Sequence, residues 1–212
     1  MEISIELVKD LRQRTGAGVI DCKTALQEAG GDVDAAIEYL RRKGLASAAK
    51  KAGRIATDGL VSSYIHAGGK MGVLVEINCE TDFVAKTEDF QTFVKNIAMH
   101  IAATNPQYLR REEIPAEVLE REKRIYRSQA LDSGKPEKVI DKIVQGKMER
   151  FYSEVCLLEQ TYVKDSDLTV KEVLDTIISK VGENINIRRF ARFQLGEGLL
   201  ARSQPACAPS TE

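Results

Sequence analysis

The sequence has little net charge and no long apolar run. Its 31 basic and 32 acidic side chains leave a net charge of -1, which argues against nucleic-acid binding by bulk electrostatic attraction and leaves room only for a local basic patch. No apolar run approaches the roughly 18 residues of a membrane span, and Met1 to Glu6 contain no basic signal region. We therefore expect an intracellular protein that binds neither nucleic acid directly nor a membrane.

Nucleotide-binding loops and metal-ligand patterns are also absent. Neither GxxxxGK[ST] nor GxGxxG occurs after a predicted strand, so we expect no nucleotide held by such a loop and no cofactor. The cysteines, which have neither metal-ligand nor disulfide spacing, are Cys22, Cys79, Cys156 and Cys207. We expect a reduced chain without a metal site.

A nucleophile pair of Cys79 with His66 or His100 is the enzymatic alternative. Nothing in the sequence marks either histidine as the base or any third group as its orienter. Free cysteines commonly behave as small buried apolar side chains. We therefore expect that the protein is not an enzyme.

What the sequence does contain is a compact motif from Asn78 to Lys86. It follows Val73–Ile77, a β-branched apolar run that predicts a buried strand, and it precedes apolar residues at helical spacing. Asp82 and Phe83 thus lie side by side where a strand ends, a position from which a scaffold can present two side chains to a partner. These residues alone favour a simpler interpretation, in which Asp82 caps a turn and Phe83 packs in the core.

Residues 1–44 predict a small module of three helices. Ser4 and Asp32 are candidate N-caps, and glycine turns separate the apolar stripes. None of these helices is long enough to be stable alone, so they must pack on one another. The third is expected to end at Gly44, and residues 45–56 are expected to be a linker whose small side chains permit helix or coil.

Residues 57–198 predict a core domain of fold class α+β. Gly68–Gly69 lies between the predicted strands Leu60–His66 and Met71–Cys79, which is a hairpin signal. A third strand is expected over 184–195, with one face made of Ile185, Ile187, Ala191, Phe193 and Leu195. Helices are expected over 87–103 and from Thr169 to Gly182, the latter with a capping box.

Two charged amphipathic helices joined by the Gly134–Pro136 turn predict a helical hairpin over about 116–152. The last stretch, residues 199–212, has two prolines and little apolar content, and we expect it to be a disordered tail.

Three stretches of the sequence together resemble the elongation factor Ts family, the guanine-nucleotide exchange factors for elongation factor Tu. They are Leu11–Leu26, Glu76–Lys86 and Val181–Arg189. The resemblance covers about residues 1–198. It implies a ubiquitin-associated-like N-terminal module, a core built on a three-stranded antiparallel sheet with covering helices, and a helical hairpin that protrudes from it.

The resemblance also implies a site and a partner. Asp82 and Phe83 would enter the GTPase domain of elongation factor Tu, either GDP-bound or nucleotide-free, and promote GDP release near its magnesium and phosphate site. The contact residues that it implies are Arg12, Val19, Ile20, Lys23, Lys51, Thr81, Asp82, Phe83, Val84, Val181 and Gly182. The expected location is the cytoplasm, or the plastid stroma if the chain is organellar.

The chain departs from the longer family members, which carry two related core subdomains. A single three-stranded sheet leaves exposed edges and an uncovered face, so we expect either a homodimer, as short members form, or coverage by the partner. Val19–Ile20 replaces a more methionine-like pair. The competing interpretation is a pure interaction module whose three N-terminal helices bind a ubiquitin-like or helical partner. The second and third stretches favour the exchange factor, because an adaptor does not need them.

Overall fold

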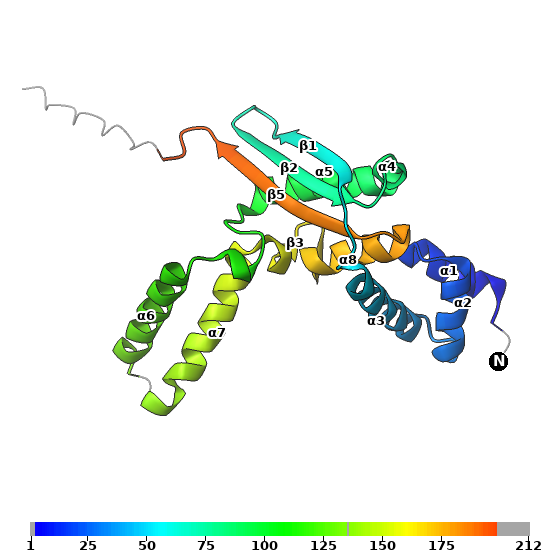
Figure 1. Ribbon diagram of the computed structural model, residues 1–212. Coiled ribbons are helices and arrows are strands. Elements are labelled where there is room, and N and C mark those ends of the chain that lie inside the picture. The colour runs from blue at the N-terminus through cyan, green and yellow to red at the C-terminus, as the bar shows by residue number, and fades with distance from the viewer. Residues whose placement is uncertain (1–2, 135, 199–212) are drawn as a thin grey trace, which may run out of the picture.

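Figure 1 shows the computed structural model, which describes residues 3–134 and 136–198. Helices at the N-terminus precede a three-stranded antiparallel sheet, and further helices cover one face of this sheet or project from it. The predicted fold class, α+β, is confirmed. The predicted tail, residues 199–212, lies outside the described residues.

The N-terminal helices are α1 (Ile5–Thr15), α2 (Val19–Glu28) and α3 (Val33–Lys51). As expected, the side chains of Ser4 and Asp32 accept hydrogen bonds from backbone N–H groups in the first turns of α1 and α3. The helices share a small buried core of Leu11, Cys22, Ala25, Leu26 and Ala36.

The sequence predicted that the third helix ends at Gly44, but the helix runs on past this residue. It continues to Lys51, so more than half of the expected linker over 45–56 is helical. Alanine and lysine in this stretch favour helix. Gly44 is buried where α3 meets α8 (Val170–Val181), and a Cβ added to it would lie 3.6 Å from Ser179. A tertiary contact therefore overrides the usual role of glycine as a helix end.

The sheet has the order β1-β2-β5. Its strands are β1 (Asp58–Ile65), β2 (Met71–Cys79) and β5 (Ile185–Gln194), all antiparallel to their neighbours. One face packs on α5 (Glu88–Thr104) and α8, and alternate residues of β2 enter the main core there. They are Val73, Val75, Ile77 and Cys79.

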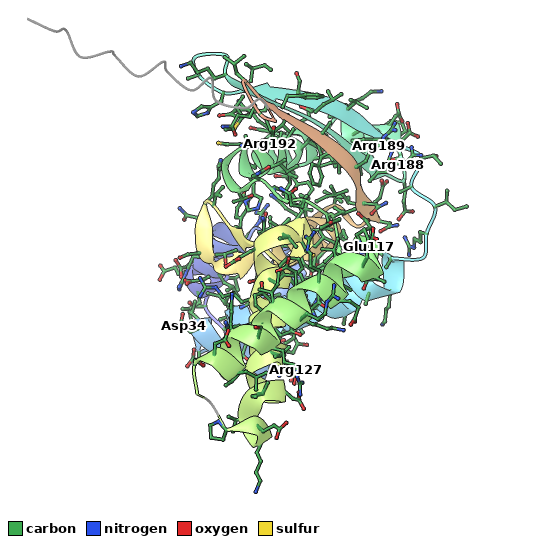
Figure 2. The ribbon with its side chains drawn as sticks, turned by 90° about the vertical axis from the view of Figure 1, so that its left-hand side faces the viewer. Asp34, Glu117, Arg127, Arg188, Arg189 and Arg192 are labelled. Atoms are coloured by element: carbon green, nitrogen blue, oxygen red, sulfur yellow. The ribbon has the colours of Figure 1, made fainter. Side chains whose placement is uncertain are left out.

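A β-bulge changes which side chains of β5 point toward the core. The register shifts between Glu76 and Ile77, so that Arg188 and Arg189 both lie opposite Glu76, and each donates a 2.7 Å hydrogen bond to its carboxylate. Figure 2 shows the two arginines together near one end of β5, with Arg192 further along. The extra residue reverses the inward and outward alternation beyond it.

The prediction that β5 has a single apolar face is therefore wrong for the second half of the strand. Ile185 and Ile187 are buried, whereas Phe193 and Leu195 are exposed on the opposite face of the sheet. Phe190 packs against the main core in their place.

The helical hairpin consists of α6 (Ala116–Asp132) and α7 (Glu137–Val155), and it projects away from the sheet (Figure 1). Arg127 donates to Asp141 across the hairpin at 2.7 Å. Short elements complete the chain: α4 (Asp82–Ala85), η1 (Arg111–Glu113), η2 (Leu157–Glu159), β3 (Thr161–Tyr162) and β4 (Asp165–Thr169). No helix in the described part of the chain is long and apolar enough to span a membrane.

Candidate functional site

The central motif forms α4, a single helical turn at the end of β2. The hydroxyl of Thr81 caps this turn by accepting from the Val84 N–H. Val84 and Ala85 are buried, whereas Phe83 is 78% exposed. The simpler interpretation of these residues is thus wrong on both counts: Thr81 rather than Asp82 is the cap, and Phe83 does not belong to the core.

Asp82 lies beside Phe83 at the surface and is paired within its own helix. The Lys86 ammonium donates to its carboxylate at 2.6 Å, and this hydrogen bond lowers the pKa of Asp82 below its usual value. Asp82 is therefore charged at neutral pH. Val84, another of the predicted contact residues, is packed in the main core on the inner side of α4.

The C-terminal end of α8 meets α4. Gly182 ends α8 in the left-handed region, with φ 82°, and this conformation suits glycine because it has no Cβ. The next residue, Glu183, accepts from the Thr81 N–H at 3.0 Å and from the Thr81 hydroxyl at 2.7 Å. Val181 and Gly182 are thereby held next to the helix that carries Phe83.

The turn between α1 and α2 also faces the end of α8. A Cβ on Gly16 would lie 3.5 Å from Cε of Lys180, and the Lys180 ammonium donates to Asp89 of α5 at 2.6 Å. The turn in the first sequence stretch is thus brought to the same end of α8 as the second and third stretches, which Figure 1 shows on the side of α1 and α4. An ion pair between Arg41 of α3 and Glu172 links α3 to the other end of α8.

The other predicted contact residues lie on the N-terminal helices. Val19 and Ile20, at the start of α2, are 53% and 80% exposed. Arg12 and Lys23 are exposed as well, and half-buried Lys51 donates to the Ser47 hydroxyl at 2.9 Å. The structure therefore joins Thr81–Phe83 with Val181–Gly182. Val84 lies in the core, and the remaining predicted residues lie on other parts of the surface.

The structure gives the proposed nucleophile pair no support. The Cys79 thiol is buried and donates to the Thr81 carbonyl at 3.1 Å, and burial, with the charge of Glu183, raises its pKa to about 11. His66 is bonded to Tyr64 and His100 to Gln160. Within the two described ranges, no group of three or more His, Cys, Asp or Glu side chains could hold a metal ion.

Sequence reasoning gave no role to three residues that organise this site. They are Lys86, Lys180 and Glu183. Lys86 follows Asp82 at helical spacing, which is a detectable signal for an ion pair. Glu183 and Lys180 act on residues 102 and 91 positions away, and a single sequence carries no signal for such pairs.

Comparison with known proteins places the chain in a family. The family model described as Elongation factor TS matches residues 45–197. The chain is 61% identical over 206 residues to elongation factor Ts of Carboxydothermus hydrogenoformans, covering 97% of this chain and 95% of that protein. It is 63% identical over 199 residues to elongation factor Ts of Geobacter sulfurreducens, covering 94% and 92%. The chain belongs to the elongation factor Ts family.

Proposed function

We propose that this translation elongation factor binds elongation factor Tu and promotes the release of GDP from it. The observation that carries the proposal is Phe83, an aromatic ring left 78% exposed on a short helix at the point where the second and third sequence stretches meet. An aromatic side chain gains a large apolar contact area when a partner buries it. An exposed ring held by a rigid scaffold is thus suited to enter another protein.

Such an exchange factor needs no covalent chemistry, and we propose that the protein is not an enzyme. It must bind the nucleotide-free partner more tightly than the nucleotide-bound one. Thermodynamic linkage then requires that it weaken nucleotide binding by the same factor. Each 1.4 kcal/mol of coupling corresponds to about a tenfold change in affinity.

In the proposed mechanism, Phe83 inserts between helices of the GTPase domain and displaces the ligands of its magnesium ion and phosphates. Magnesium neutralises the phosphate charges, so a disturbed magnesium shell removes a large local attraction for the nucleotide. Asp82, which is charged and adjacent, acts on the same region by hydrogen bonding or repulsion. The N-terminal helices bind through Arg12, Lys23 and the exposed pair Val19–Ile20.

The test is release of labelled GDP from elongation factor Tu, measured with and without this protein. We expect acceleration at catalytic amounts of the factor, and no acceleration would refute the assignment. Phe83→Ala is expected to lose most of the acceleration while keeping partner binding. Arg12→Ala is expected to weaken binding, with the maximal rate retained at saturation. The opposite pattern would contradict this division of roles.

We further propose that two copies pair through the open face of the sheet. Its exposed apolar side chains are Val61, Ile65, Leu74, Phe193 and Leu195. The longer family members carry a second core subdomain, which a second copy would replace by symmetry. The alternative occupant is elongation factor Tu itself. We place this activity in the cytoplasm, or in the stroma for an organellar chain, without direct nucleic-acid or membrane contact.

A further inference from the structure

We infer that Glu183 is a positioning residue for Phe83: its carboxylate fixes Thr81, the residue at which α4 begins, and thereby holds the exposed ring in its presented position. The predicted effect on nucleotide exchange rests on the proposed function. The predicted effect on the ring does not, because it can be measured on the isolated protein.

The need for such a residue follows from the length of α4. The helix has four residues, and a single turn is not stable without outside contacts, because nucleation fixes several backbone dihedrals for very few hydrogen bonds. Its own cap is weak, since the Val84 N–H lies 3.5 Å from the Thr81 hydroxyl oxygen. Burial of Val84 and Ala85 holds one side of the turn, and Phe83 on the other side gains nothing from the core.

Glu183 supplies the missing polar restraint. One carboxylate oxygen accepts from the Thr81 backbone N–H at 3.0 Å, and the other accepts from the Thr81 hydroxyl at 2.7 Å. Both donors of Thr81 are thus fixed by one charged group, and charge-assisted hydrogen bonds are stronger than neutral ones. Because Thr81 lies two residues before Phe83, fixing its backbone sets the direction in which the ring leaves the surface.

A reciprocal contact joins the same two loops. Glu80, the neighbour of Thr81, accepts from the backbone N–H of Asn184 at 2.6 Å. The buried Asn184 side chain in turn donates to the Arg54 carbonyl at 2.7 Å. Each loop therefore receives a carboxylate from the other, so residues 80–83 and 182–184 form one unit. The second and third sequence stretches are coupled physically, and this coupling explains why an acid follows Gly182.

The chain offers a matched control for this contact. At the start of α8, Glu172 accepts from the Thr169 N–H at 2.8 Å and from the Thr169 hydroxyl at 3.0 Å. The chemistry is the same, but the site lies at the opposite end of α8 from Gly182. Thr169→Ala therefore reports what the loss of a threonine–carboxylate contact does to stability in general.

The first experiment uses the absence of tryptophan from the sequence. Phe83→Trp gives a single indole at the position in question, and its fluorescence anisotropy reports local motion on the nanosecond scale. We expect Glu183→Ala to lower the anisotropy in this background, and Thr169→Ala to leave it unchanged at a comparable loss of melting temperature. Equal anisotropy with and without Glu183, or an equal fall in the control, would overturn the inference.

The second experiment measures GDP release from elongation factor Tu. Glu183→Ala is expected to slow the catalysed release about tenfold, the factor equivalent to about 1.4 kcal/mol. In a Phe83→Ala background Glu183→Ala should have no further effect, because it acts through the ring. Additive losses would mean that Glu183 contacts the partner directly, and the inference would be wrong.

A failure of the proposed function can be distinguished from a failure of the role inferred for Glu183. If even the unmodified protein did not accelerate GDP release, the proposed function would fail, while the anisotropy comparison would still decide the role of Glu183. Should Glu183→Ala not fold, Thr81→Ala is the second variant, since it keeps the backbone bond to Glu183 and removes the hydroxyl bond together with the weak cap to Val84. It is expected to give a smaller anisotropy change of the same sign, and the absence of any change in the folded variant would count against the inference.

Discussion

His100 shows at the scale of one residue how the core constrains protonation. The ring is fully buried. Nδ1 accepts from the Val163 N–H at 3.3 Å, so the proton lies on Nε2, which is 3.0 Å from the Gln160 amide oxygen. Both nitrogens are satisfied only in the neutral form. Burial lowers the pKa of His100 below its ordinary value.

The expected consequence is a loss of stability in mild acid. As the pH falls, the unfolded chain binds a proton on this histidine near pH 6.5, before the folded chain does. The stability contributed by the neutral His100 ring is therefore complete above about pH 6.5 and declines as the pH falls through the pKa of His100 in the folded protein. One extra proton bound by the unfolded state changes the free energy of unfolding by at most about 1.4 kcal/mol per pH unit. Urea unfolding between pH 7.5 and 5 would measure it.

His100→Asn is expected to flatten this pH dependence while lowering stability at neutral pH. The control is His66→Asn, because His66 is exposed at the end of the β1–β2 hairpin. It should reproduce the slope of the unmodified protein. If the slope survived in His100→Asn, the titration would belong to other groups.

Cys79 permits a direct test of the enzymatic alternative. With its pKa raised to about 11, about one thiol in a thousand is ionised at pH 8, and the thiolate is the reactive form. Cys22 and Cys156 are likewise buried. We expect these three cysteines to resist iodoacetamide in the folded protein and to react on unfolding, as followed by peptide mass spectrometry. Rapid alkylation of folded Cys79, with loss of exchange but intact partner binding, would favour a nucleophile.

At the scale of elements, the contact between α3 and α8 positions the N-terminal helices. An added Cβ on Gly44 would lie 3.6 Å from Ser179, an ordinary contact distance. Gly44→Ala is thus expected to stabilise the protein by about 1 kcal/mol through helix propensity. Gly44→Leu is expected to destabilise it by about 1–3 kcal/mol, because the longer side chain forces the helices apart. Thermal unfolding would measure both.

The matched control for this contact is Gly146→Leu in α7, where an added Cβ meets nothing within 4 Å. It should raise stability, because leucine is the better helix former. We also expect Gly44→Leu, but not Gly146→Leu, to weaken binding to elongation factor Tu, because α3, unlike α7, packs against α1 and α2, which carry Arg12 and Ile20. Equal effects of the two leucines would rule out a positional role for Gly44.

Elements were predictable where local signals decide them. The Thr169–Glu172 capping box and the β1–β2 hairpin around Gly68–Gly69 are formed as predicted. The bulge was not predictable, because the alternation from Ile185 onward carries no sign of two arginines sharing Glu76. The site shows the same limit of local signals. The sequence identified the motif, but whether Phe83 is buried depends on which residues α5 and α8 cover when they pack on the sheet.

At the scale of the whole molecule, the outer face of the sheet carries large apolar side chains that no element of the described chain covers. Phe193 and Leu195 are 71% and 76% exposed, and Ile65 and Leu74 lie with them along an open groove. The bulge in β5 is what turns Phe193 and Leu195 toward this face. Large exposed apolar patches on proteins often mark interaction surfaces. The same irregularity that removes these side chains from the core therefore creates the apolar patch on which the proposed pairing depends.

We expect Phe193→Glu to convert a dimer into a monomer. A charge at this position has to be desolvated when two sheet faces meet, whereas it remains hydrated in a single copy. Sedimentation equilibrium at micromolar concentration should give twice the monomer mass for the unmodified protein and the monomer mass for the variant. Leu131→Glu is the control, because Leu131 is half exposed on α6, away from the sheet, and it should remain dimeric. A monomer in every case, combined with weaker binding of Phe193→Glu to elongation factor Tu, would instead assign this face to the partner.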